Sequence, residues 1–129
     1  MLKSNELLVN RLPLAAFFRL IGKESSRPIM VSLAYGLLKG LQENKITIRQ
    51  AENILFNPDV LLLCDEQRYD ALIIEVIEYG MELADIDELV DDKTVLFDAV
   101  VECQEKLHYI NIPTVIPDIP THVISALER

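Results

Sequence analysis

Apolar residues recur at helical spacing along most of this chain, and stop signals separate the runs. The clearest run lies between Glu66 and Tyr79 and places five apolar residues on one face: Tyr69, Leu72, Ile73, Val76 and Ile77. A spacing of three and four residues puts side chains on one side of an α-helix, whereas a half-buried strand alternates every second residue. The pattern therefore predicts an all-α fold.

Capping patterns indicate where several helices begin. Thr47 with Gln50 is a capping box, and Asn57-Pro58 combines a preferred N-cap with proline at the first helical position. In the first half of the chain we expect a segment capped by Ser4 and ended near Pro13, a helix over Leu14–Ile21 before Gly22, and a helix with Pro28 in its first turn and Asn44 at its end. Two short helices should follow, over Ile48–Phe56 and Pro58–Leu63. The rest should form a helix over Glu66–Tyr79 capped by Asp65 and ended by a left-handed Gly80, an acidic turn or two over Met81–Val90, and a helix over about Asp92–His108. We therefore expect a compact bundle of about five to seven short helices.

The chain length allows one hydrophobic core. A chain of 129 residues is too short for two ordinary domains, so we expect a single α-helical domain over residues 1–129. After the last helix, Pro113, Pro117 and Pro120 each follow an isoleucine. Because the residue before proline is pushed toward extended geometry, this tail is predicted to be an extended proline-rich C-terminal strap packed on the helices.

Targeting signals and cysteine usage favour a cytoplasmic protein. The apolar stretch Leu12–Ile21 contains Pro13 and Arg19, whereas a membrane span needs roughly 20 mainly apolar residues. No clear secretory cleavage site follows it, so we expect no membrane association. Cys64 and Cys103 both lie in apolar helical patterns, which favours buried free thiols over a disulfide.

Catalytic patterns are nearly absent. The two histidines, His108 and His122, have no partner at a metal-ligand spacing, and neither a phosphate-binding loop nor a nucleophile elbow occurs. We therefore expect no catalytic residue, no metal site and no cofactor, and a protein that is not an enzyme. An enzyme whose acidic residues line a cleft is a third, weaker hypothesis.

The charge is distributed unevenly. Residues 1–50 carry eight basic and three acidic residues, residues 51–129 carry four and eighteen, and the total is −9. Nucleic acid is a poor partner for such a chain, because phosphate binding needs clustered Lys and Arg. The acids are densest between Glu82 and Asp92, although Asp91 or Asp92 also suits a helix N-terminus. The candidate partner-binding residues are Tyr79, Glu82, Asp85, Asp87, Glu88, Asp91 and Asp92.

Two stretches carry a resemblance to a family. YGLLKGLQENKITIRQAENILFNP over Tyr35–Pro58 and LIIEVIEYGMELADIDELV over Leu72–Val90 are similar to a family of small bacterial proteins of uncharacterised function. The most recognisable parts are Ile48–Phe56 and Tyr79–Ile86. The resemblance implies a helical fold and no particular activity.

A looser resemblance is to acidic bacterial immunity proteins, which neutralise a toxin, often a basic nuclease, by covering it. It rests on size, acidity and the acidic segment, and is an analogy of physical properties. It implies a small acidic protein-binding module whose charge steers a basic partner and whose apolar anchors hold it. Those anchors would be Tyr79, Met81, Ile86 and Leu89.

The alternative is a homo-oligomeric structural or regulatory helical protein. Its basic N-terminal half would dock on its own acidic half, most simply in a homodimer, and its self-association would weaken as salt rises. The basic and acidic halves could equally pair inside one folded chain.

Overall fold

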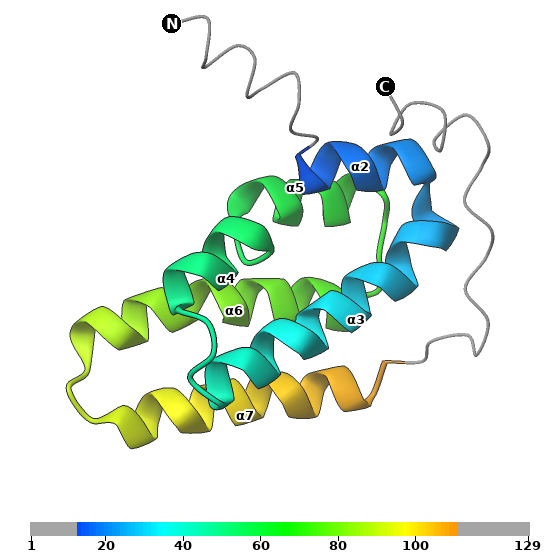
Figure 1. Ribbon diagram of the computed structural model, residues 1–129. Helices are drawn as coiled ribbons and strands as arrows, with labels where there is room; N and C mark the ends of the chain where they lie inside the picture. The colour runs from blue at the N-terminus through cyan, green and yellow to red at the C-terminus, as the bar shows by residue number, and fades with distance from the viewer. Residues whose placement is uncertain (1–12, 111–129) are drawn as a thin grey trace, which may run out of the picture.

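The computed structural model describes residues 13–110, and these residues form six α-helices and no β-strand (Figure 1). The helices are α2 (Leu14–Ile21), α3 (Lys23–Gln42), α4 (Ile48–Ile54), α5 (Pro58–Glu66), α6 (Ala71–Leu89) and α7 (Lys93–His108). The prediction of an all-α bundle is confirmed. The helix expected after Ser4 and the proline-rich strap lie outside the described residues.

The helices α6 and α7 form an antiparallel hairpin that is the base of the bundle (Figure 1). α3 lies along α7, while α4 and α5 pack against α6. α2 contacts both α3 and α5 and so closes the other end of the bundle. Within residues 13–110, none of the helices is both long and apolar enough to cross a membrane.

Three predicted helix starts are confirmed by their capping hydrogen bonds. The Gln50 amide donates to Thr47 Oγ1 at 3.1 Å, and the Thr47 amide donates to Gln50 Oε1 at 2.9 Å. Asn57 Oδ1 accepts from the amide of Val60 at 3.0 Å, with Pro58 as the first helical residue. At α7, Asp92 Oδ1 accepts from a backbone amide two residues later at 2.9 Å. Local side-chain chemistry therefore determines where these helices begin.

The start of α3 differs from the sequence-based prediction. Pro28 was expected in the first turn, but α3 begins at Lys23 and Pro28 lies inside the helix, where it is buried. Gly22 makes the early start possible: at φ 84° and ψ 169° it joins α2 directly to α3, in a region open almost only to glycine. Pro28 lacks the N–H that would bond the carbonyl of Glu24, and burial of its ring accompanies that loss.

The predicted start and end of α6 were also wrong. Asp65 does not cap α6 but lies within α5, and Asp70 is the residue that precedes α6. Gly80 does not end a helix, because α6 continues through it to Leu89. The segment Met81–Val90 is therefore not a separate acidic turn but the second half of a 19-residue helix and the residue after it.

Gly80 has a packing role in the middle of α6. A Cβ atom at this position would lie 2.2 Å from Cδ1 and 2.4 Å from Cγ of Phe56, whose side chain is 1% exposed. The absence of a side chain lets the aromatic ring lie directly on the helix backbone. Tertiary contact therefore explains this glycine better than its local conformation.

The core contains two buried thiols and one buried polar contact. Cys64 and Cys103 are both free and fully buried, as predicted. Burial raises the pKa of the Cys64 thiol to about 12 and that of the Cys103 thiol to about 11. The hydroxyl groups of Ser26 and Tyr69 are hydrogen-bonded to each other inside the core, so neither is an unsatisfied buried polar group.

Candidate functional site

The net negative charge of the described residues lies on the α6–α7 hairpin. Residues 13–70 contain seven basic and seven acidic residues and are neutral overall. Residues 71–110 contain eleven acidic residues against two basic ones, for a net charge of −9. The structural boundary of the acidic part is thus the start of α6, rather than residue 50.

Part of the basic character of the N-terminal half is neutralised within the fold. Arg19 Nε donates to Glu66 at 2.7 Å, which links α2 to α5. Arg27 forms an ion pair with Asp70 at the start of α6, and its hydrogen bonds hold the pKa of that carboxyl below its usual value. Some basic side chains of the N-terminal half therefore pair with acids inside the folded chain, which was one of the hypotheses from the sequence. The acids in these pairs are not those of the hairpin.

Four carboxylates lie along the outward side of α6. They are Glu75, Glu78, Glu82 and Asp85, and all four are exposed. Their spacing of three and four residues places them on one side of the helix. Leu89 continues the same row one turn later and is 83% exposed.

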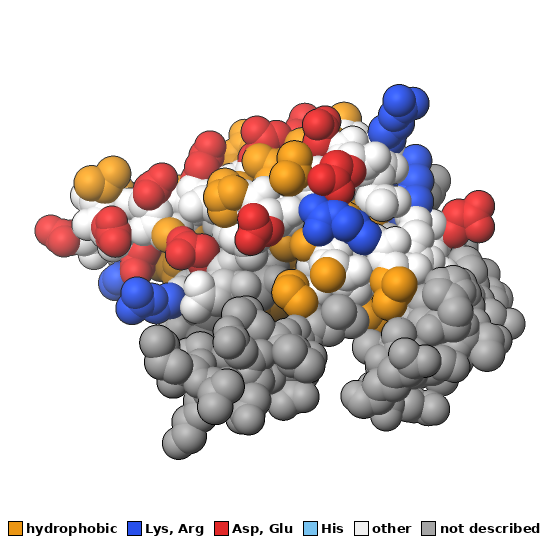
Figure 2. Space-filling model, turned by 90° about the horizontal axis from the view of Figure 1, so that it is seen from above, with side chains coloured by type: hydrophobic (Ala, Val, Ile, Leu, Met, Phe, Trp, Pro, Cys, Tyr) orange, Lys and Arg blue, Asp and Glu red, His pale blue; other side chains and the backbone are white. Residues whose placement is uncertain are grey.

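A second acidic row lies on α7. Asp98, Glu102 and Glu105 are exposed and spaced by four and three residues. The two rows lie on helices that pack against each other, and Lys106 of α7 forms an ion pair with Glu75 of the α6 row. We call the two rows together the hairpin acidic face: Glu75, Glu78, Glu82, Asp85, Asp98, Glu102 and Glu105. Figure 2 shows that acidic side chains outnumber Lys and Arg at the left end of the molecule, which holds the α6–α7 turn.

One cation lies against this face. Lys106 Nζ is 3.4 Å from a carboxylate oxygen of Glu75 and 4.5 Å from the centre of the Tyr79 ring. The ammonium group therefore covers a ring that the sequence had suggested as a partner anchor. Tyr79 is only partly exposed, and in this structure it contributes to the contact between α6 and α7.

The acidic residues predicted from the sequence divide among several positions. Glu82 and Asp85 lie on the hairpin acidic face. Asp87 faces α7, and its Oδ1 accepts a hydrogen bond from Lys93 Nζ at 3.0 Å in an ion pair. Glu88 is exposed near the C-terminal end of α6, about 120° around the helix axis from Glu82.

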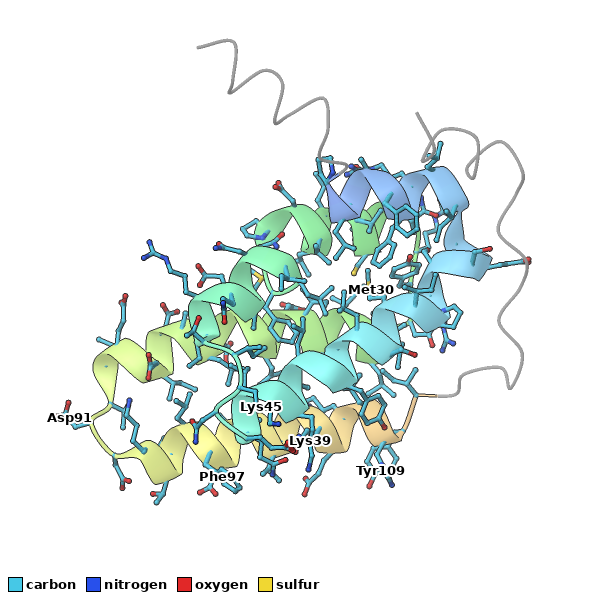
Figure 3. All side chains as sticks on the ribbon, in the orientation of Figure 1. Met30, Lys39, Lys45, Asp91, Phe97 and Tyr109 are labelled. Carbon is cyan, nitrogen blue, oxygen red and sulfur yellow. The ribbon has the colours of Figure 1, made fainter. Side chains whose placement is uncertain are left out.

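The last two predicted acids belong to the turn between the helices. Asp91 is exposed in that turn, and Figure 3 shows it at the end of the molecule. Asp92 caps α7, and hydrogen bonds from the hydroxyl and amide of Thr94 lower the pKa of its carboxyl. Asp92 therefore has a structural role, as one reading of the sequence anticipated.

Sequence reasoning omitted five members of the face. They are residues that were not among the candidate partner-binding residues: Glu75, Glu78, Asp98, Glu102 and Glu105. The signal was present in their helical spacing relative to Glu82, but it required knowing that α6 is one long helix paired with α7. A search for acids contiguous in sequence could not find residues contributed by two helices.

Apolar side chains accompany the acids at the α6–α7 end. Leu89 is 83% exposed and Val95 is 42% exposed, so both are accessible to a partner. Of the other expected anchors, Met81 is partly buried against the core and Ile86 is partly buried. Among residues 13–110, no group of three or more His, Cys, Asp and Glu side chains is arranged to hold a metal ion.

Comparison with known proteins places the chain in a family without assigning an activity. No curated protein and no solved structure matches it. A family model described as "Protein of unknown function (DUF3969)" matches residues 22–115, from the glycine that precedes α3 to beyond the end of α7. Both stretches that carried the resemblance to an uncharacterised family lie within the match. The chain therefore belongs to this family of proteins of unknown function, DUF3969.

Proposed function

We propose that the chain is a non-catalytic protein-binding module whose hairpin acidic face binds a basic protein. The observation that carries the proposal is the concentration of the whole −9 charge of the described residues on α6, α7 and their turn. A field of one sign over one surface speeds encounter with a partner of the opposite sign and disfavours partners of the same sign. Only Lys93 and Lys106 oppose it among residues 71–110.

Apolar contact at the α6–α7 end supplies the lasting part of the interaction. Charged rims mainly affect association rates, whereas a few buried apolar groups dominate the free energy of binding. Leu89 is the best-placed anchor because its side chain is 83% exposed beside the acidic row of α6. The expected interface therefore has Leu89 at its turn end and the carboxylates of α6 and α7 beside it.

The more specific form of this proposal is an immunity-type protein, which neutralises a basic toxin or nuclease by covering its active surface. Its support is the small size and the acidic face of this chain. In this form the partner alone would arrest growth of a producing cell, and coexpression of the chain would restore growth.

The test is affinity capture from a lysate of the source organism at low and high salt. Three versions of the tagged chain are compared: the wild type, a face variant (Glu78→Gln, Glu82→Gln, Asp85→Asn) and a control variant (Glu24→Gln, Glu52→Gln, Asp65→Asn). Both variants remove three negative charges, but the control changes residues outside the hairpin. Bound proteins are identified by mass spectrometry.

The proposal predicts that the wild type and the control variant retain one basic protein in near-stoichiometric amount, and that the face variant or high salt releases it. Equal loss from both variants would mean that net charge matters and the face does not. Recovery of nothing but further copies of the chain would instead favour the homo-oligomeric alternative, with salt-sensitive self-association as its signature.

A further inference from the structure

A cavity of about 580 Å³ opens at the end of the bundle, where α3 leads into α4 and meets the hairpin. Six apolar residues line it, Leu41, Ile46, Ile48, Leu96, Phe97 and Val100, together with the polar residues Gln42, Asn44, Thr47, Asp87 and Lys93. Phe97 is 48% exposed, and Figure 3 shows it projecting from α7 at the lower edge of the molecule. A cavity of this size is in the range of small-molecule sites and exceeds what one partner side chain would fill.

The loop that shapes the cavity is held firmly. Asn44 has a positive φ of 58°, which ends α3 in a tight turn, and the capping box at Thr47 fixes the start of α4. Ile46 packs against Gly40, where an added Cβ would lie 3.1 Å from its side chain. The apolar wall is therefore largely preformed in the folded chain.

One ion pair lies at the boundary of this apolar space. Asp87 from α6 and Lys93 from α7 both line the cavity, with Lys93 Nζ 3.0 Å from Asp87 Oδ1. The Lys93 side chain is 74% exposed and that of Asp87 is 39% exposed. An exposed lysine on a flexible stem exchanges its partner at little cost, because such surface pairs contribute little stability.

The charge around the cavity discriminates between ligands. The hairpin that supplies Asp87 and Lys93 carries a net charge of −9. Beside the other wall, Lys45 in the α3–α4 loop and Arg49 at the start of α4 add two positive charges. The summed field is negative and attracts cations. A ligand ammonium that replaces Lys93 at Asp87 keeps the carboxylate paired and releases the lysine to water. A ligand carboxylate that pairs with Lys93 would leave Asp87 unpaired in a negative field.

We propose that this cavity binds an amphipathic small cation, with its apolar body against Phe97, Leu96 and Ile48 and its single ammonium group at Asp87. The site is separate from the hairpin acidic face and does not depend on the protein partner. It gives the chain a second binding activity, directed at aliphatic or aromatic amines.

The experiment titrates n-octylammonium, octanoate and octanol into the full chain and follows methyl resonances of Leu, Ile and Val by NMR. We expect n-octylammonium to bind with a Kd on the order of 1 mM, at least about threefold tighter than octanoate. The shifted methyl groups should belong to residues of the cavity wall. Absence of such shifts up to the solubility limit, or tighter binding of octanoate, would overturn the proposal.

Matched variants test the role of Asp87 without removing any core residue. Asp87→Asn and Asp85→Asn each remove one charge from α6, but only Asp87 lines the cavity. Binding of n-octylammonium should weaken about two- to fivefold in Asp87→Asn and change little in Asp85→Asn. Lys93→Ala should tighten it, because the competing ammonium is gone. Equal weakening in both aspartate variants, or weaker binding in Lys93→Ala, would contradict the proposed ion exchange.

Discussion

Substituting Gly80 by alanine should destabilise the protein, although alanine is normally the better helix residue. In the interior of α6 this change alone would stabilise the helix by about 1 kcal/mol. The new Cβ, however, would lie 2.2 Å from Cδ1, 2.4 Å from Cγ and 2.7 Å from Cε1 of Phe56. The rigid ring would have to retreat by more than about 1 Å within a close-packed core.

The two opposing effects differ in size. Overpacking of a core costs typically about 1–3 kcal/mol, and a clash with a ring that is 1% exposed belongs at or beyond the upper end. After subtracting the gain in helix propensity, we expect Gly80→Ala to lower the free energy of unfolding by about 2 kcal/mol. Gly36→Ala is the matched control, because a Cβ there meets nothing within 4 Å. That control should raise stability by about 0.5–1 kcal/mol.

Urea unfolding followed by circular dichroism measures both variants against the wild type. The double variant Phe56→Leu with Gly80→Ala completes a cycle, in which the cost of the new methyl group should fall once the ring is absent. If Gly80→Ala were as stabilising as Gly36→Ala, the proposed contact between the ring and the helix backbone would be refuted. A cost that is unchanged in the Phe56→Leu background would place its origin elsewhere.

Three further predictions concern pH, thiol reactivity and backbone strain. The ion pair with Arg27 lowers the folded-state pKa of Asp70, so the stability that this pair gives the fold is complete above the unfolded pKa of about 3.9 and is lost as pH falls through the folded pKa. The difference in unfolding free energy between wild type and Asp70→Asn should therefore be constant above about pH 5 and shrink in acid. A constant difference down to about pH 2 would contradict this. Cys64 and Cys103, with pKa values raised to about 12 and about 11, should react with iodoacetamide at pH 8 at least about 100-fold more slowly in the folded chain than in urea. Gly22→Ala should cost about 1–3 kcal/mol because φ there is 84°, although a Cβ would meet no neighbouring atom, and urea midpoints close to those of the wild type would disprove that strain.

Helix starts and the buried face of a helix could be predicted because they depend on residues close together in the sequence. The starts of α4, α5 and α7 depend on hydrogen bonds between residues no more than three positions apart, and a sequence shows these directly. Burial of Ile73, Val76 and Ile77 followed equally from their spacing along one helix. These features need no knowledge of the rest of the chain.

The errors arose where a distant contact overrides local preference. Glycine is typical of a helix end, and only the approach of Phe56, from the connection between α4 and α5, explains why Gly80 lies inside a helix. Proline is typical of a helix start, but α3 begins five residues before Pro28 because of the unusual backbone conformation of Gly22. No local pattern distinguishes these uses of glycine and proline from the common ones.

The candidate site was partly predictable for the same reason. The density of acids after Glu82 is visible in the sequence, but their division among helix faces depends on the length of α6 and on its pairing with α7. Asp87 and Asp92 were assigned to the same surface as Glu82, yet one pairs with Lys93 and the other caps α7. The number of acidic residues in a sequence segment is therefore larger than the number that share one surface of the folded chain.

The hairpin acidic face has opposite effects on the free chain and on its proposed complex. Its carboxylates repel one another, and Lys106 is the cation that the described residues place against them, so repulsion opposes folding of the free protein. Added salt screens that repulsion and should raise the urea midpoint of the free chain, while it weakens attraction to a basic partner. Removing the charges of Glu78, Glu82 and Asp85 should have the same two consequences at low salt. The acidic face lowers the stability of the free chain and becomes favourable only beside positive charge, and this is the physical reason for expecting a basic partner. If salt did not raise the stability of the free chain, the repulsion would not lower that stability and the reasoning would fail.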